Sequence, residues 1–351
     1  MIFVDIYSMG VKYIRKITED DEVPNFNEEG LRKFFLYSYD PELGWVRKPF
    51  TSDFENGKDG RVVMFRIDDK GARYNPGHQD LRLHISIYGD SFAMSRQVND
   101  NETIAYYLSE LTNSNVLNFG VGNYGADQAF LRIKREYPKN KTEKVVLAIV
   151  PEQILRITSY WKHYLEYGNH FGFKPRFELS NNGLRLIPNI MDSEEKFDHL
   201  RELIPKIKKH DYWYERKFSK DFGKEFTWDE MTKVSLDLRV KYFSDKESVK
   251  IFSGIIDLFK KYSQEQKFIP FLVFLPYKND VSFTRENCSS FYSNFVSICS
   301  KKIDTLDLMS HLVGLDDKIL NKYYSDDNDY GGHYSKEGNM YISNIIYNFL
   351  K

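Results

Sequence analysis

Short, largely apolar runs alternate with amphipathic segments over much of the chain. The runs that predict strands occupy residues 83–88, 115–119, 144–150, 268–275 and 302–308. The segments that predict helices occupy residues 101–112, 126–137, 246–263, 281–300 and 334–350. Strands that are apolar along their whole length are buried on both faces, and their alternation with helices favours a parallel sheet between two helical layers. The pattern therefore predicts an α/β fold.

Two stretches depart from this alternation. Residues 1–80 are irregular and polar, apart from a strand candidate at 62–67. Residues 156–245 are rich in aromatic and basic side chains, with helical patches near 193–210 and 228–242. That length exceeds an ordinary strand-to-helix connection. We expect an N-terminal extension at 1–80, an α/β domain built from 81–155 and 246–351, and an inserted cap or helical and aromatic subdomain at 156–245.

Composition and charge limit the classes of partner that the chain is expected to bind. Among 351 residues, 50 basic and 51 acidic side chains leave a formal net charge of −1, so nothing draws the whole chain to nucleic acid or to an anionic membrane. No apolar run reaches the roughly eighteen residues of a membrane span. The amino terminus lacks the basic start and long apolar stretch of a signal peptide. We expect a cytoplasmic protein; its oligomeric state stays open.

Cysteine and histidine usage gives no sign of a metal. Cys288 and Cys299 are too few for a disulfide framework or a metal cluster, and their spacing of about three helical turns would place them on one helix face. The eight histidines show no metal-ligand spacing. We therefore expect neither a metal nor another cofactor.

The apolar run at 83–88 ends at Gly89-Asp90-Ser91, and helix-like sequence follows. A serine on the turn from a buried strand into a helix is held at the rim of the sheet, which is the placement a nucleophile needs. The alternative is an ordinary turn in which Asp90 or Ser91 caps the helix. His333, on a loop before the last predicted helix, could reach the same rim and act as the base.

Three blocks in this order resemble the SGNH (GDSL) hydrolase family. They are Tyr88-Gly89-Asp90-Ser91-Phe92, residues 117–128 (Leu-Asn-Phe-Gly-Val-Gly-Asn-Tyr-Gly-Ala-Asp-Gln), and residues 333–339, which begin with His333. Upstream, Leu43-Gly44-Trp45 and Gly71-Ala72-Arg73 are similar to stretches in bacterial, surface-polysaccharide-associated members.

The resemblance implies a flavodoxin-like three-layer sandwich that performs acyl-ester chemistry. Ser91 would attack the ester carbonyl, with His333 as base and then acid. The main-chain N–H groups of Ser91 and Asn123 would stabilise the oxyanion. Asn123 stands where the family usually has glycine, and asparagine tolerates left-handed backbone better than most residues.

The chain departs from the family in a further block, which the family has after the strand that is predicted here at 144–150. There the family has an asparagine that donates to the oxyanion, but this chain has Glu152, and an ionised carboxylate cannot donate. Either Gln153 takes over the role, or Glu152 stays protonated, or the site performs other chemistry. Glu152 could also simply cap the following helix.

A second departure concerns the acid that orients the histidine. The family commonly places aspartate three residues before the histidine, and that position is Tyr330 here. Asp329 is the candidate for this role, with Asp326 and Asp327 nearby. A Ser-His dyad supported by a backbone carbonyl is the alternative, and the aspartates could equally form a solvated turn.

The predicted insertion begins with basic and aromatic side chains. Arg156, Tyr160, Trp161 and Arg176 would suit stacking against a sugar or an anionic glycan. The alternative is a subdomain with its own aromatic core, in which lysine and arginine stems lie along apolar surface.

The resemblance thus implies a serine esterase or O-acyltransferase that acts on a small acyl group, such as acetyl, of a carbohydrate or glycan precursor. The rival prediction is a weak or inactive member of the fold that binds a glycan or a partner protein. Glu152 and Tyr330 are the residues in its favour.

Overall fold

A parallel five-stranded sheet lies at the centre of the computed structural model, which describes residues 11–13, 23–166, 168–217, 225–328 and 330–351. Its strands are β6 (Leu83–Tyr88), β7 (Asn115–Asn118), β8 (Lys144–Ile149), β12 (Ile269–Phe274) and β13 (Asp304–Asp307). They pair in parallel in the order β13-β12-β8-β6-β7. Counted along the chain this is the 2-1-3-4-5 order of a flavodoxin-like, doubly wound sheet. The predicted fold class is confirmed.

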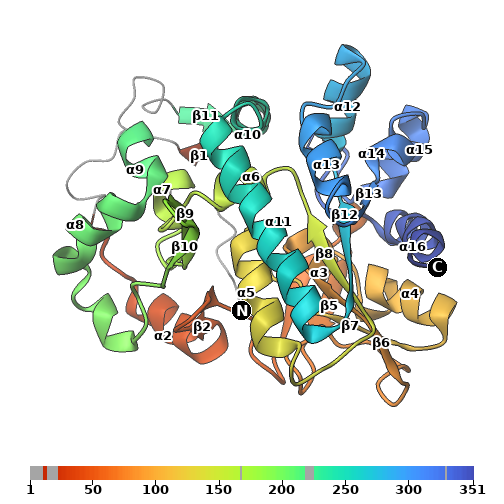
Figure 1. The fold of residues 1–351 in the computed structure, drawn as a ribbon, viewed down its shortest axis with the longest axis horizontal. Coiled ribbons are helices and arrows are strands. Elements are labelled where there is room, and N and C mark those ends of the chain that lie inside the picture. The colour runs from red at the N-terminus through yellow and green to blue at the C-terminus, as the bar shows by residue number, and fades with distance from the viewer. Residues whose placement is uncertain (1–10, 14–22, 167, 218–224, 329) are drawn as a thin grey trace.

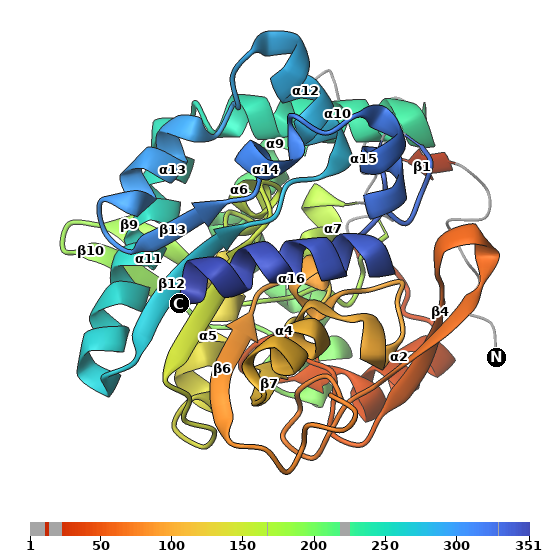
Figure 2. The same cartoon turned by 90° about the vertical axis from the view of Figure 1, so that its right-hand side faces the viewer.

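Helices cover both faces of the sheet. On one face α4 (Ile104–Thr112) packs beside α16 (Lys336–Leu350), which crosses in front of the sheet in Figure 2. On the other face α11 (Lys246–Gln266) contacts α5 (Ala126–Glu136) and α13 (Ser293–Ser300), and it runs diagonally across the front of Figure 1. The central strands β6, β7 and β8 are buried along nearly their whole length, as expected for strands that helices cover on both faces.

The other elements are short or lie outside the central sheet. The strand pairs are β1 (Val11–Tyr13) with β11 (Glu225–Thr227), β2 (Tyr39–Asp40) with β3 (Gly44–Trp45), β4 (Ser52–Asn56) with β5 (Val62–Arg66), and β9 (Arg176–Ser180) with β10 (Gly183–Ile187). The helices are α2 (Glu28–Tyr37), α3 (Ser91–Met94), α6 (Gln153–Arg156), α7 (Lys162–Leu165), α8 (Leu200–His210), α9 (Tyr212–Lys217), α10 (Trp228–Tyr242), α12 (Lys278–Asn287), α14 (Met309–Leu312) and α15 (Asp317–Tyr323). Single 3-10 turns occupy Lys58–Gly60, Asp100–Glu102 and Glu194–Phe197.

The N-terminal part is more regular than its sequence suggested. The predicted strand at 62–67 is confirmed as β5, but it pairs with β4, which was not expected. Helix α2 was also not expected. It begins after Asn27, whose side chain accepts a hydrogen bond from the Gly30 amide at 2.9 Å. Asn27 followed by two acidic residues is a helix-start signal. The prediction that this stretch is irregular was therefore wrong.

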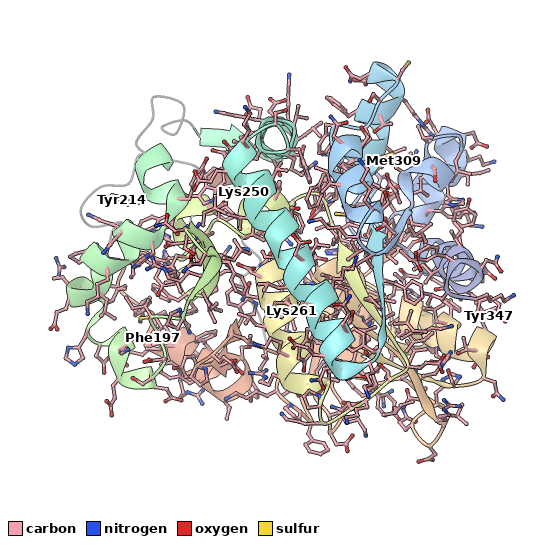
Figure 3. All side chains as sticks on the ribbon, in the orientation of Figure 1. Phe197, Tyr214, Lys250, Lys261, Met309 and Tyr347 are labelled. Atoms are coloured by element: carbon pink, nitrogen blue, oxygen red, sulfur yellow. The ribbon has the colours of Figure 1, made fainter. Side chains whose placement is uncertain are left out.

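The segment after β8 shares its core with the N-terminal part. Phe197, labelled in Figure 3, packs against Phe34, Phe35 and Tyr39, with ring centroids 6.0, 5.2 and 5.8 Å apart. Trp161 belongs to the same continuous apolar core as the central sheet. Helices α8 and α9 nevertheless lie well to one side of α11, opposite α12, α13 and α15 (Figure 1).

The predicted helix at 281–300 is two helices, α12 and α13. Helix α12 ends at Cys288, which takes left-handed backbone with φ 54°. The two cysteines therefore do not share a helix face, and both are free; Cys288 is exposed and Cys299 is buried. The run of small polar residues at 287–290 favours a turn over a continuous helix, which explains the break.

The described ranges contain neither a membrane-spanning helix nor a cluster of metal-ligating side chains. None of their helices has the length and apolar character to cross a membrane. Within the same ranges, no three histidine, cysteine or acidic side chains gather where they could hold a metal ion.

Candidate active site

Ser91 stands on a tight turn between β6 and α3. Gly89 permits the turn, because a Cβ there would lie 2.7 Å from the carbonyl oxygen of Ala148 on the neighbouring strand. Asp90 caps α3 by accepting a hydrogen bond from the Phe92 amide at 3.0 Å. Ser91 is 7% exposed, and neither its hydroxyl nor its N–H bonds to another described residue. Asp90 thus caps the helix while the polar groups of Ser91 stay available.

The serine turn occupies the topological switch point of the sheet. The chain leaves β6 toward β7 on one side, whereas β8 continues to β12 and β13 on the other. Open α/β sheets bind ligands in the crevice at this point.

The loop after β7 lies against the serine turn. The Val121 amide donates to the Gly89 carbonyl at 3.1 Å, and Gly120 approaches the main chain of α3 so closely that a Cβ would overlap it. Asn123 has left-handed backbone with φ 67°, and its N–H bonds to no other described residue. The structure therefore leaves the amides of both predicted oxyanion donors, Asn123 and Ser91, unpaired.

The two upstream segments of the resemblance support this edge of the sheet. The Trp45 indole donates to the Gly122 carbonyl at 2.9 Å, and the Tyr124 hydroxyl donates to the Trp45 carbonyl. The buried guanidinium of Arg73 donates to the carbonyl oxygens of Met94, Ser95 and Val98. One segment thus holds the loop after β7, and the other holds the chain that leaves α3.

His333 is presented by a loop before α16. Tyr324 and Tyr334 pair across this loop, and both hydroxyls donate at 2.8 Å to one carbonyl oxygen just beyond β12. The imidazole packs on Phe92, with ring centroids 4.9 Å apart. Phe92 directly follows Ser91, so the structure brings the two predicted residues to one edge of the sheet. They are not hydrogen bonded to each other; such contacts often form only with substrate bound.

Gln97, which the sequence did not single out, holds the imidazole. Its side-chain oxygen accepts hydrogen bonds from His333 Nδ1 at 2.7 Å, from the His333 amide at 3.0 Å and from the Ser325 hydroxyl at 2.8 Å. Glu55 of β4 in turn fixes the backbone of Gln97. Its carboxylate accepts hydrogen bonds from the Gln97 main-chain N–H at 2.9 Å and from the Arg96 guanidinium at 2.7 Å. No sequence signal marks Gln97, because Glu55 and His333 lie 42 and 236 positions away.

The surroundings keep the imidazole neutral. Burial, and after it the charge of Arg96, lower the pKa of His333 to about 3, and Glu55 opposes them only in part. At neutral pH the ring therefore carries no charge and one of its nitrogens is free to accept a proton.

The acid expected beside His333 cannot be placed, because Asp329 lies outside the described residues. Asp326 accepts from the Gln97 side-chain nitrogen at 3.3 Å instead of contacting the imidazole. Tyr330, at the family position of the acid, packs on another tyrosine ring with centroids 5.1 Å apart. Within the described part of the chain, the partner of Nδ1 is an amide.

Glu152 belongs to a buried charge network. It accepts hydrogen bonds from the Tyr277 hydroxyl at 2.8 Å and the Ser235 hydroxyl at 3.1 Å, and it pairs with Arg156. Burial alone would raise the pKa of Glu152, but Arg156 and Arg239 outweigh it and hold the pKa well below its usual range. Glu152 is therefore ionised and cannot donate to an oxyanion. Its side chain does not cap α6.

Gln153 and Arg156 lie just beyond it. The Gln153 amide is fully buried and donates to the Ala148 carbonyl at 3.3 Å, so its donor is directed at the edge of β8. Arg156 donates to Asp90 at 2.7 Å as well as to Glu152. This guanidinium joins the serine turn to Glu152, in the segment after β8.

The structure buries the four residues that were expected to contact a glycan. Tyr160 donates to the Pro188 carbonyl at 2.7 Å, the Trp161 indole to the His170 carbonyl at 3.0 Å, and Arg176 to the Thr158 carbonyl at 2.9 Å. Arg156 is engaged as described above. All four are at most 4% exposed, which corrects the expectation of a sugar-stacking surface: they belong to the interior of this segment.

Neither a family model nor a curated protein matches the sequence. Among solved structures, the chain is similar to a putative lipolytic protein of the G-D-S-L family from Desulfitobacterium hafniense DCB-2 (14% identity, 76% of this chain and 99% of that one, TM-score 0.36). It is also similar to the acetyl xylan esterase AlAXEase (11%, 77% and 100%, TM-score 0.40) and to a lipase/acylhydrolase from Enterococcus faecalis (11%, 76% and 94%, TM-score 0.35). These likenesses are distant, and the fold class rests on the strand order of the sheet itself.

Proposed function

We propose that this protein is a serine ester hydrolase with Ser91 as nucleophile and His333 as general base. The observation that carries the proposal is the serine turn. Its hydroxyl and N–H have no hydrogen-bond partner among the described residues, and they stand at the switch point, where the neutral imidazole packs on the next residue, Phe92. The motif resemblance supports the same assignment.

The reaction would follow the usual order for a serine hydrolase. The Ser91 oxygen attacks the ester carbonyl while its proton passes to His333. The main-chain N–H groups of Ser91 and Asn123 donate hydrogen bonds to the carbonyl oxygen, which becomes negatively charged. His333 then returns the proton to the leaving alcohol. Water, or the hydroxyl of an acceptor, then attacks the acyl carbonyl and gives its proton to His333. The bond from the acyl group to Ser91 breaks, and His333 returns that proton to the Ser91 oxygen. Ester hydrolysis and O-acyl transfer share every step except this last nucleophile.

We further propose that the acyl group is small, acetyl being the natural case, and that the alcohol is a carbohydrate. Ser91 is so enclosed that a long acyl chain would have to displace its neighbours. The carbohydrate part rests on the resemblance of the two upstream segments alone. Rates on p-nitrophenyl acetate, butyrate and octanoate should fall as the chain lengthens.

The test is hydrolysis of p-nitrophenyl acetate together with fluorophosphonate labelling. Ser91→Ala and His333→Ala should each lower kcat/KM by at least about 10³-fold, and mass spectrometry should place the phosphonate on Ser91. Ser300→Ala and His199→Ala, at exposed positions, are matched controls that should leave the rate unchanged. Equal rates in the wild-type protein and Ser91→Ala would refute the proposal.

A second candidate is a binding protein built on the same fold. Two observations favour it: the Ser91 hydroxyl and the imidazole are not hydrogen bonded, and the ionised Glu152 stands where the family has an oxyanion donor. A protein that is folded yet unreactive toward the fluorophosphonate at Ser91 would select this candidate.

A further inference from the structure

We propose that Gln97 is the third residue of the site, a neutral positioning residue that holds His333 with its proton on Nδ1 and leaves Nε2 as the base. This inference rests on the proposed function. In it, the side-chain amide of Gln97 takes the role of the aspartate that was expected to orient His333.

The hydrogen bonds around Gln97 determine which end of its amide faces the imidazole. The acceptor oxygen receives the His333 main-chain N–H, which can only donate. The amide nitrogen faces the Asp326 carboxylate at 3.3 Å and the Asn56 carbonyl at 3.4 Å, which accept. The atom 2.7 Å from Nδ1 is therefore the oxygen, and Nδ1 must be the protonated nitrogen of the neutral ring.

The backbone that carries Gln97 is held in an unusual conformation. Gln97 and Ser95 both have left-handed backbone, with φ 66° and 58°. Such positions are costly for residues other than glycine and persist only where the surroundings enforce them. Here Glu55 holds the Gln97 amide and Arg73 holds the neighbouring carbonyl oxygens. The fold therefore enforces this placement of the amide.

An amide orients the ring without stabilising its charged form. The imidazolium that forms when Ser91 loses its proton would have the Gln97 oxygen against Nδ1. Among the described residues no carboxylate takes that place, unlike in an aspartate-containing triad. The charged groups that act on the ring come from several segments: Arg96 after α3, Glu55 of β4, Glu152 just before α6 and Arg156 within it. The nearest further titratable groups act one contact away. Asp326 bonds to the Gln97 side chain, Tyr277 and Tyr334 pack on Phe92, and Tyr330 packs on Tyr277. The consequence is a base that stays unprotonated in acid, where an ordinary histidine would become charged.

Gln97→Glu separates orientation from charge. Glutamate matches glutamine in shape, and its carboxylate can accept the same three hydrogen bonds, so the loop should keep its structure. The new charge beside Nδ1 should raise the pKa of His333 by about one to three units. It should also raise kcat/KM at pH 7 by up to about tenfold, because the imidazolium is now stabilised. If Asp326 repels the new carboxylate, Gln97→Glu combined with Asp326→Asn should recover the effect.

Gln97→Leu removes the acceptor altogether. The proton of the neutral ring should then shift in part to Nε2, and kcat/KM should fall by about 10²-fold. Gln264→Glu is the matched charge control, because it adds the same charge on an exposed position of α11; it should change neither the pKa of His333 nor the rate.

The readouts are ¹⁵N NMR of the His333 ring and the pH profile of p-nitrophenyl acetate hydrolysis. In the wild-type protein we expect protonated Nδ1, no titration of His333 between pH 5 and 8, and a flat acid limb of kcat/KM. In Gln97→Glu the inflection should move up to about pH 4–6, so both readouts are extended down to about pH 4. A wild-type ring protonated on Nε2, or a Gln97→Glu protein with an unchanged His333 pKa, would overturn the inference. A protein that hydrolyses no ester refutes the proposed function instead, while the NMR result still decides the role of Gln97.

Discussion

The two sides of the candidate site are held by different kinds of interaction. On the serine side, Asp90, Arg156 and Glu152 form a buried chain of charges. On the histidine side, the neutral amide of Gln97 and the ring of Phe92 hold the imidazole. Removing one member of a buried ion pair leaves an unpaired charge, which costs far more than the loss of one neutral hydrogen bond. The serine should therefore be rigidly placed, and the histidine should be the adjustable partner.

The largest effect should come from breaking the charged side. Arg156→Met removes the guanidinium that pairs with both Asp90 and Glu152. It should lower the free energy of unfolding by about 3–5 kcal/mol. Urea denaturation measures this. The matched control is Arg185→Met, because the Arg185 guanidinium is 62% exposed where it pairs with Glu178 at 3.1 Å; its loss should stay below about 1 kcal/mol. Comparable losses in the two variants would remove the distinction between the two sides.

Acid should affect stability through the neutral histidine. The pKa of His333 is lowered to about 3, against about 6.5 in an unfolded chain. Between these values the unfolded state binds one more proton, so the free energy of unfolding falls as the pH drops, by up to about 1.4 kcal/mol per pH unit. Denaturation of His333→Gln across pH 4–7 should show a shallower fall. His199→Gln, at an exposed histidine, should keep the wild-type slope; a slope that His333→Gln leaves unaltered would contradict the assignment.

The smallest effect should come from trimming the neutral side. Ser325→Ala removes one of the three hydrogen bonds to the Gln97 oxygen and should cost about 1 kcal/mol. The imidazole keeps its own bond to Gln97, so the pH profile should not move. Ser300→Ala, on the exposed end of α13, should cost no more than about 0.5 kcal/mol. A Ser325→Ala loss as large as that of Arg156→Met would mean that both sides are equally rigid.

Much of the fold could be predicted from the sequence, because each central strand carries its signal within its own six or so residues. The run that forms β6 is largely apolar because both faces of the sheet are covered, and the residues after it form the serine turn locally. The predictions of secondary structure were wrong where the sequence signal for a helix start or a helix end is weak. Helix α2 depends on the cap at Asn27, and the break at Cys288 depends on a few small polar residues inside an otherwise helical pattern.

The site could be predicted only in part. Ser91 and His333 belong to recognisable blocks, and the structure brings those blocks to one edge of the sheet. Gln97 and Glu55 belong to none. Nor did the sequence indicate that the guanidinium of Arg156 turns inward to Asp90 and Glu152 instead of outward to a ligand. Burial of a basic side chain depends on which carboxylates reach it, and these come from separate segments.

By itself, the sequence determined the sheet, the serine at the end of its first strand and the order of the blocks, because these depend on hydrophobic periodicity and on chemistry within a few neighbouring residues. Tertiary structure alone decided the partner of the imidazole, the ionisation of Glu152 and the burial of the aromatic segment. Each of these is a sum of contacts between residues far apart in the chain, and such contacts exist only once burial has brought the segments together.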